Sequence, residues 1–432
     1  NYDLCYKILE ENPYAINIPM IPNENHVIAP APHLMGEALP RRSFVTICMP
    51  LLFFIQNHRW DLVTSVLENL PLSFKSINVT DGDGNTPIML VAAEPGTIEI
   101  LKILITYGAK INGDYENYSP LACAAKHNQL DNYRFLIDRG ADINYKNCYS
   151  NNIIMIAIDQ RDLVNLDIIK DLLLHGIKVD DINLSGESAL LIAVRNNHID
   201  AVRLLLEYNA NIEHTNNDGN TALSIACMFG HRNIVELLIK HHANIEHVNN
   251  HGRTPFMLSS YNGYCDVAQY LFAQGANIHH VDKNKNSALT LRAWNSASNN
   301  NDLECIQFLN SIGININLPN IAGKTALVYA AFNNHLSLVK YLVKQGAKVT
   351  NYIQHMPNNN CRLYLENFIK TENAFVMFSA SKIGIHRISK KSTLKKLPKE
   401  MICSTLQILH GDDAVKEAME RHQIQSQAVP HI

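Results

Sequence analysis

A motif that returns every 33 residues constrains this chain more than any other feature. Thr221-Ala222-Leu223 is followed at that interval by Thr254-Pro255-Phe256 and again by Ser287-Ala288-Leu289. Between two such motifs, as in residues 218–247, the residue pattern predicts a turn, a short helix, a tight turn, a longer helix and an extended segment. A fixed period of this length predicts a stack of repeats, each of which buries its apolar face against its neighbours.

The motif positions have physical roles. The hydroxyls of Thr221 and Thr254 suit capping of a first helix, and Gly219 suits a turn position with positive φ. The second helix ends at glycine in most repeats, and Asn209 and His242 replace that glycine in two of them. By this pattern, first helices begin after Thr86, Ser119, Asn152, Ser188, Thr221, Thr254, Ser287 and Thr325.

The third of these repeats departs most from the pattern. Ser150-Asn151-Asn152-Ile153 lacks both the glycine and the Thr-Pro pair, so we expect an irregular hairpin and helix start there. From about Arg42 to Thr350 the sequence resembles the ankyrin-repeat family. The resemblance implies an all-α-rich solenoid of about eight helix-turn-helix repeats with β-hairpin turns.

The flanks lack the period. We predict a non-repeat N-terminal arm over residues 1–42, the ankyrin-repeat array over 43–350, and a C-terminal appendage over 351–432. Within the arm a short helix is expected over residues 2–11. The appendage is expected to hold a helix near 361–370, a mixed segment over 374–388, a basic loop over 390–399 and helices near 399–409 and 412–421.

The composition gives no support for nucleic-acid or membrane partners. The formal net charge is −3, which gives no reason to expect direct nucleic-acid binding or attraction to a membrane surface. The longest apolar run, residues 45–55, is too short to span a bilayer. Nine cysteines without a CxxC pair favour reduced thiols in a reducing compartment. We expect a monomer without cofactor or bound metal.

Partner binding is what the family resemblance implies. In ankyrin proteins the hairpin tips and first-helix faces form a concave surface for another protein. The residues expected on this surface are Asn216, Asn217, Asn249, Asn250 and His251 at hairpin tips, and Phe229, Tyr261 and Asn262 near the ends of first helices.

Histidines and asparagines offer two further readings. The clustered His241, His242, His247 and His251 are expected to be polar turn residues rather than zinc ligands, since adjacent histidines point in different directions. Asn144 and Asn317 resemble the hairpin asparagine that asparaginyl hydroxylase modifies in many ankyrin proteins. A turn asparagine that tolerates left-handed geometry is the simpler reading, and the two readings do not exclude one another.

A cysteine-protease-like site is the first alternative function. Cys361, His386 and Asp412 (or Asp413) follow the order nucleophile, base, orienting acid of papain-like enzymes. Other sets are Cys5 with His26 or His33, and Cys48 with His58 and Asp61. No local family signature surrounds any of them.

A ubiquitin-ligase adaptor is the second alternative. Leu397-Pro398-Lys399-Glu400-Met401 resembles the opening of an F-box, although a proline-started amphipathic helix explains it as well. The nearby lysines 390, 391, 395, 396 and 399 resemble a nuclear-import patch, or a solvated loop.

The asparagine-, isoleucine- and lysine-rich repeats resemble type IV-secreted ankyrin effectors of intracellular bacteria. That resemblance implies a protein delivered into the host cell, which binds a host protein in the cytoplasm or the nucleus and displaces its usual partners.

Overall fold

The computed structural model describes residues 51–52, 54–68, 75–113, 118–160, 164–295, 301–349 and 359–380, together with positions 354 and 357. The chain divides into two compact units, up to Gly323 and from Lys324 onward, which are described separately. The expected N-terminal helix over 2–11, the basic loop and the helices after residue 380 lie outside the described residues.

Seven helix pairs follow one another in the first unit, after α3 (Trp60–Glu68) and the 3₁₀ helix η1 (Lys75–Asn78). The inner helices, the first of each pair, are α4 (Pro87–Ala92), α6 (Pro120–Lys126), α8 (Ile153–Ile158), α10 (Ala189–Arg195), α12 (Ala222–Phe229), α14 (Pro255–Asn262) and α16 (Ala288–Trp294). The outer helices are α5 (Ile98–Thr106), α7 (Leu130–Asp138), α9 (Leu166–Leu174), α11 (Ile199–Glu207), α13 (Arg232–Lys240), α15 (Cys265–Ala273) and α17 (Asn301–Ser311).

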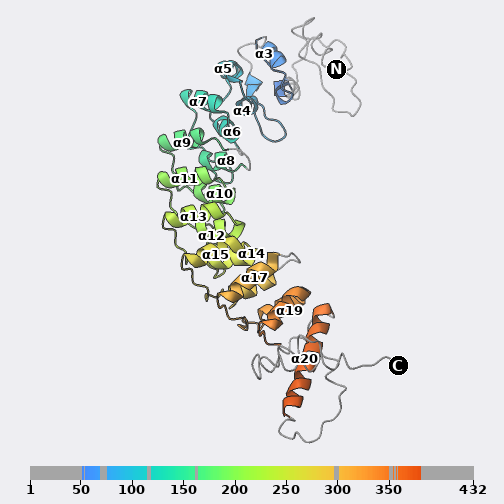
Figure 1. Ribbon diagram of the computed structural model, residues 1–432. Helices are drawn as coiled ribbons and strands as arrows, with labels where there is room; N and C mark the ends of the chain where they lie inside the picture. Colours follow the sequence, from blue (N-terminus) through green and yellow to red (C-terminus); the bar gives the residue numbers. More distant parts are fainter. Residues whose placement is uncertain are drawn as a thin grey trace, which may run out of the picture. The chain divides into compact units, whose positions relative to one another are not determined.

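The core lies between two rows of helices. Each inner helix packs on the next inner helix and each outer helix on the next outer one (Figure 1). The inner helices are buried almost all round, as in α10, where only Arg195 is not buried. An outer helix such as α11 buries one stripe, formed by Ala201, Val202 and Leu205. Such a stripe is the usual solution for a helix with one face in solvent.

The expected helix ends are confirmed. Thr221 Oγ1 accepts a hydrogen bond from the Ser224 backbone N–H at 3.3 Å, which caps α12. At the other end of the outer helices, Asn209 (φ 61°) and His242 (φ 64°) adopt the left-handed conformation that glycine adopts in other repeats. Asn209 and His242 therefore adopt the same backbone conformation as the glycine of other repeats, and the outer helices end in the same way.

The third repeat is regular, contrary to the expectation. Ser150 takes the positive-φ turn position (φ 62°) and Asn152 Oδ1 accepts from the Met155 N–H at 3.1 Å. Asparagine is as good a cap as threonine, so α8 begins at Ile153, one residue after its cap as in the other repeats. Among the described residues, the hairpin turns contain one isolated bridge, between Lys146 and Asn152.

Asn152→Ala is expected to lower the free energy of unfolding by about 1 kcal/mol, because α8 loses its cap. Urea denaturation followed by circular dichroism measures this. Asn152→Ser keeps an acceptor at the same place and is the control. An equal loss in both variants would contradict the capping role.

The second unit contains the eighth pair, α18 (Ala326–Phe332) and α19 (Leu336–Lys344), and α20 (Asn360–Ala380). α20 contacts both helices of the pair and buries Cys361 and Leu365. The helix continues beyond the expected 361–370, because residues 371–380 contain neither proline nor glycine. Among the described residues, no helix is long and apolar enough to cross a membrane.

Candidate interaction surface

One acidic or amide side chain organises each hairpin. Asn249 Oδ1 accepts from the backbone N–H groups of His251 and Arg253, both at 3.0 Å. This arrangement satisfies the donors of a tight turn without a strand ladder. The same pair of bonds, two and four residues ahead, occurs at Asp81, Asn147, Asn183, Asn216 and Asp282.

Neighbouring hairpins are joined through their backbones. The Asn217 N–H donates to Ser185 O at 3.1 Å and the Asn250 N–H to Asp218 O at 3.0 Å. We call the joined hairpins, residues 147–151, 183–187, 216–220, 249–253, 282–286 and 320–323, the tip ribbon. The further bonds of the ribbon are Leu184 N–H to Tyr149 O, Lys283 N–H to His251 O and Ile321 N–H to Asn284 O.

Three histidines spaced by 33 residues contact the backbone of this ribbon. Nε2 of His214, His247 and His280 lies 2.7–3.0 Å from the carbonyl oxygens of Gly186, Gly219 and Gly252, respectively. His247, one of the clustered histidines, is therefore a structural side chain. In the part of the chain that the structure describes, no group of side chains could hold a metal ion.

A second row of side chains lies at the ends of the inner helices, seven residues after each cap. We call Lys126, Asp159, Arg195, Met228, Tyr261 and Trp294 the helix-end row. Its first half is charged and its second half apolar. Glu187 and Arg253 of the tip ribbon contact Arg195 and Tyr261 of this row, so the row and the tip ribbon adjoin each other there.

The charged half is internally paired. Lys126 donates to the Tyr118 hydroxyl at 3.1 Å and lies 4.2 Å from the centre of its ring. Arg195 lies 3.3 Å from Glu187 and 3.4 Å from Asp159. Such partly exposed pairs contribute little stability but fix the side chains in place.

The apolar half exposes large rings. The Arg253 guanidinium lies over the Tyr261 ring, 4.8 Å from the centre of that ring. The Tyr261 ring also meets the Trp294 ring edge-on, with the two ring centroids 6.2 Å apart. Trp294 is 44% exposed, and Phe229 beside the row is 43% exposed and stacks on His231. Rigid, exposed aromatic rings are typical anchors of protein interfaces.

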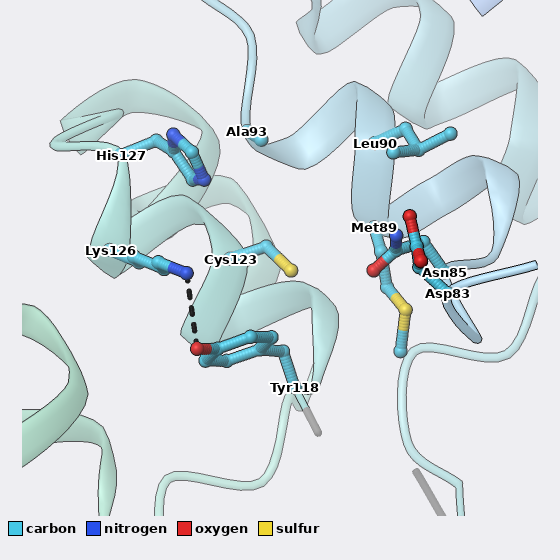
Figure 2. Close-up of a pocket in the computed structure, with 9 residues that line it drawn as sticks. All are labelled: Asp83, Asn85, Met89, Leu90, Ala93, Tyr118, Cys123, Lys126 and His127. Carbon is cyan, nitrogen blue, oxygen red and sulfur yellow. Dashed lines mark hydrogen bonds between the residues drawn. The ribbon is translucent and has the colours of Figure 1, made fainter. Parts of the chain in front are cut away.

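Two hollows adjoin the charged half and share the Tyr118–Lys126 pair. The first, about 300 Å³, lies between α4 and α6 (Figure 2). The second, about 330 Å³, reaches Asp159 and Gln160. Cys123 lines the first hollow, but burial raises the pKa of its thiol to about 12, so it is no nucleophile at neutral pH. The second hollow, whose lining is mostly polar, suits a polar side chain of a bound protein, whereas the first is mostly apolar and includes Met89 and Leu90.

The predicted tip residues differ in how exposed they are in the structure. Asn249 is 4% exposed, and its amide also donates to Asn220 Oδ1 at 2.9 Å, so it holds the fold and does not face a partner. Asn216 is half-buried with its oxygen engaged in the turn. Asn217, Asn250 and His251 are exposed, although the two asparagines donate to backbone oxygens of the preceding tips.

Among the helix-end residues, Phe229 is exposed, and Tyr261 and Asn262 are half-buried. The Asn262 amide donates to Leu258 O in its own helix. Asn144 is exposed and Asn317 is half-buried, and each N–H is bonded to a turn side chain two residues earlier.

The proposed catalytic residues are not brought together within the described residues. Cys361 is fully buried in α20, and burial raises the pKa of its thiol. A buried neutral thiol is a poor nucleophile. His386 and Asp412 lie outside the described residues, as do Cys5, His26, His33, Cys48 and Asp413. His58, which was grouped with Cys48 and Asp61, pairs with Glu94, with 3.4 Å between His58 Nδ1 and Glu94 Oε2.

Sequence reasoning missed several exposed apolar residues. Trp294 shares the position of Tyr261, one repeat later, and counting from each cap would have found it. Tyr149 and Leu184 sit on adjacent tips and are 62% and 66% exposed. A tip residue that is apolar where its equivalents are polar is the signal that points to them.

A family model that describes three consecutive ankyrin repeats matches four segments of the chain, residues 52–147, 144–216, 209–282 and 279–353. Together these segments cover more than half of the chain. The chain belongs to the ankyrin-repeat family. It is 32% identical over 125 residues to the human transient receptor potential cation channel subfamily A member 1. That match covers 28% of this chain and only 11% of the channel subunit. The ankyrin repeat domain of human ASB11 is 25% identical with a TM-score of 0.48, over 54% of this chain and 100% of that domain.

Proposed function

We propose that the tip ribbon and the apolar half of the helix-end row bind one host protein and displace its usual partners. The ankyrin repeats make the chain a protein–protein interaction module. The observation that carries the assignment of the surface is the exposure of Tyr149, Leu184, Phe229 and Trp294 on a hydrogen-bonded scaffold. Apolar groups held rigidly in water lose little entropy when a partner covers them.

The effector role is part of this proposal. Its support is the resemblance of the asparagine-, isoleucine- and lysine-rich repeats to type IV-secreted effectors, and within them to AnkH of Legionella. On this reading the protein acts as a monomer in the host cytoplasm or nucleus, where a reducing compartment suits its cysteines. No described contact favours the protease-like or the adaptor function.

Site-specific photocrosslinking tests the surface. Benzoylphenylalanine placed at Phe229 is expected to give a discrete adduct with one protein from host-cell lysate. The matched control is Phe272, which is 41% exposed but lies on the outer helix α15. An adduct at Phe272 and none at Phe229 would place the binding surface on the outer helices and overturn the proposal.

A further inference from the structure

Two cysteines meet between the sixth and seventh helix pairs. Cys265 is the first residue of α15, Cys305 lies on α17, and these outer helices pack on each other. The two thiols are neighbours, since each shifts the pKa of the other. Cys305 is fully buried, whereas Cys265 is half-buried. The Cys265 sulfur is therefore partly open to a small reagent, whereas the neighbouring Cys305 sulfur is not.

The surroundings favour a thiolate on the outer sulfur. Gln269 Nε2 donates to Cys265 Sγ at 3.5 Å, and the buried Arg292 guanidinium interacts with both sulfurs. The neighbouring Cys305 thiol lowers the pKa of Cys265, against the opposing effects of burial and of Glu304 and Asp266. The Cys265 thiol and burial raise the pKa of Cys305. Donors and a cation beside a sulfur are the setting of reactive cysteines.

Other described cysteines lack this arrangement. Cys123 and Cys227 are buried, and desolvation raises the pKa of each thiol. Cys148 is exposed on a hairpin tip. Among the residues that the structure describes, Cys265 alone combines access to solvent with a thiol neighbour.

We propose that Cys265 and Cys305 form a peroxide-reactive dithiol. The Cys265 thiolate attacks one oxygen of a hydroperoxide and breaks the O–O bond. This gives a sulfenic acid, and with hydrogen peroxide the leaving hydroxide takes a proton and departs as water. The Cys305 sulfur then attacks the Cys265 sulfur, loses its proton and expels the hydroxyl as a second water. Two thiols lose two hydrogens, and one peroxide is reduced to two waters.

The disulfide would link the outer helices α15 and α17 of the sixth and seventh repeats. Arg292 joins the two cysteines to the helix-end row, because it donates to Tyr261 O at 3.0 Å and also interacts with both sulfurs. Oxidation removes the thiolate that faces Arg292. Formation of the disulfide does not depend on whether the proposed partner surface is correct, so the two proposals fail independently.

Peptide mapping of the full-length reduced protein tests this proposal. After brief exposure to hydrogen peroxide, free thiols are alkylated in denaturant and the digest is analysed by mass spectrometry. The expected product is a Cys265–Cys305 linked peptide, two hydrogens lighter than its parts, which dithiothreitol removes. Cys265 is expected to disappear at least tenfold faster than Cys148. In Cys305→Ala, dimedone is expected to trap a sulfenic acid at Cys265.

Two results would overturn the proposal. Cys265 and Cys305 both recovered as alkylated thiols, while Cys148 is oxidised, would show that the pair is not reactive. A disulfide from Cys265 to any other cysteine would show that the thiols do not meet. The map of the unmodified sequence decides both, even if a variant fails to fold.

Discussion

Asn249→Ala is expected to lower the free energy of unfolding by about 2–4 kcal/mol. The buried Asn249 side chain accepts from two part-buried backbone N–H groups and donates to the buried Asn220. Alanine leaves those N–H groups without an acceptor, and a buried unpaired donor costs more than the hydrogen bond itself contributed. Urea denaturation followed by circular dichroism gives the value.

The neighbouring residue provides a matched control for Asn249. Asn250 is exposed and makes one side-chain bond, to Asn217 O, so Asn250→Ala is expected to cost about 1 kcal/mol or less. Asn249→Asp keeps the acceptor and is expected to fall between the two, since Asp282 serves the same turn in the seventh repeat. Equal losses at 249 and 250 would contradict the assignment of Asn249 to the fold.

Gly219→Ala is expected to cost about 2–4 kcal/mol, for two reasons. Gly219 has φ +75°, a conformation that a side chain strains. A Cβ there would also lie 2.9 Å from the Asn250 backbone nitrogen, closer than real Cβ atoms approach. The tip of the next repeat would have to move away, and its bond from Asn250 N–H to Asp218 O would break.

Gly84→Ala separates the two causes. Gly84 occupies the same turn position in an earlier hairpin with φ +83°, but a Cβ there meets nothing within 4 Å. Its replacement carries only the conformational cost, about 1 kcal/mol. Thermal denaturation of both variants measures the difference. Equal melting temperatures would mean that the close approach of neighbouring tips contributes nothing to stability.

The helix pairs could be predicted from the sequence because their signals are local. Thr221 caps the helix that begins at the next residue by accepting from the N–H of Ser224, and Asn209 ends an outer helix, both without help from distant residues. The third repeat was misjudged because the motif was sought by residue name, whereas Asn152 and Ser150 supply the same chemistry. The local rule held, and only its usual residues had changed.

The orientation of the tips could not be predicted in the same way. Asn249 and Asn250 are adjacent and identical, yet one is buried and the other exposed, because the preceding repeat supplies Asn220 on one side only. Phe229 was predicted from its place at a helix end. Trp294 followed from the same rule but was passed over, because the sequence does not show which large side chains the neighbouring repeat leaves uncovered.

The affinity of the protein captured at Phe229 for two variants tests the central claim most directly. Isothermal titration calorimetry should show Trp294→Ala weakening binding at least tenfold, because an exposed anchor ring is lost. Phe272→Ala, which removes a similarly exposed ring from α15, should change the dissociation constant less than twofold. Unchanged binding by Trp294→Ala together with a large loss in Phe272→Ala would contradict a partner surface on the inner helices.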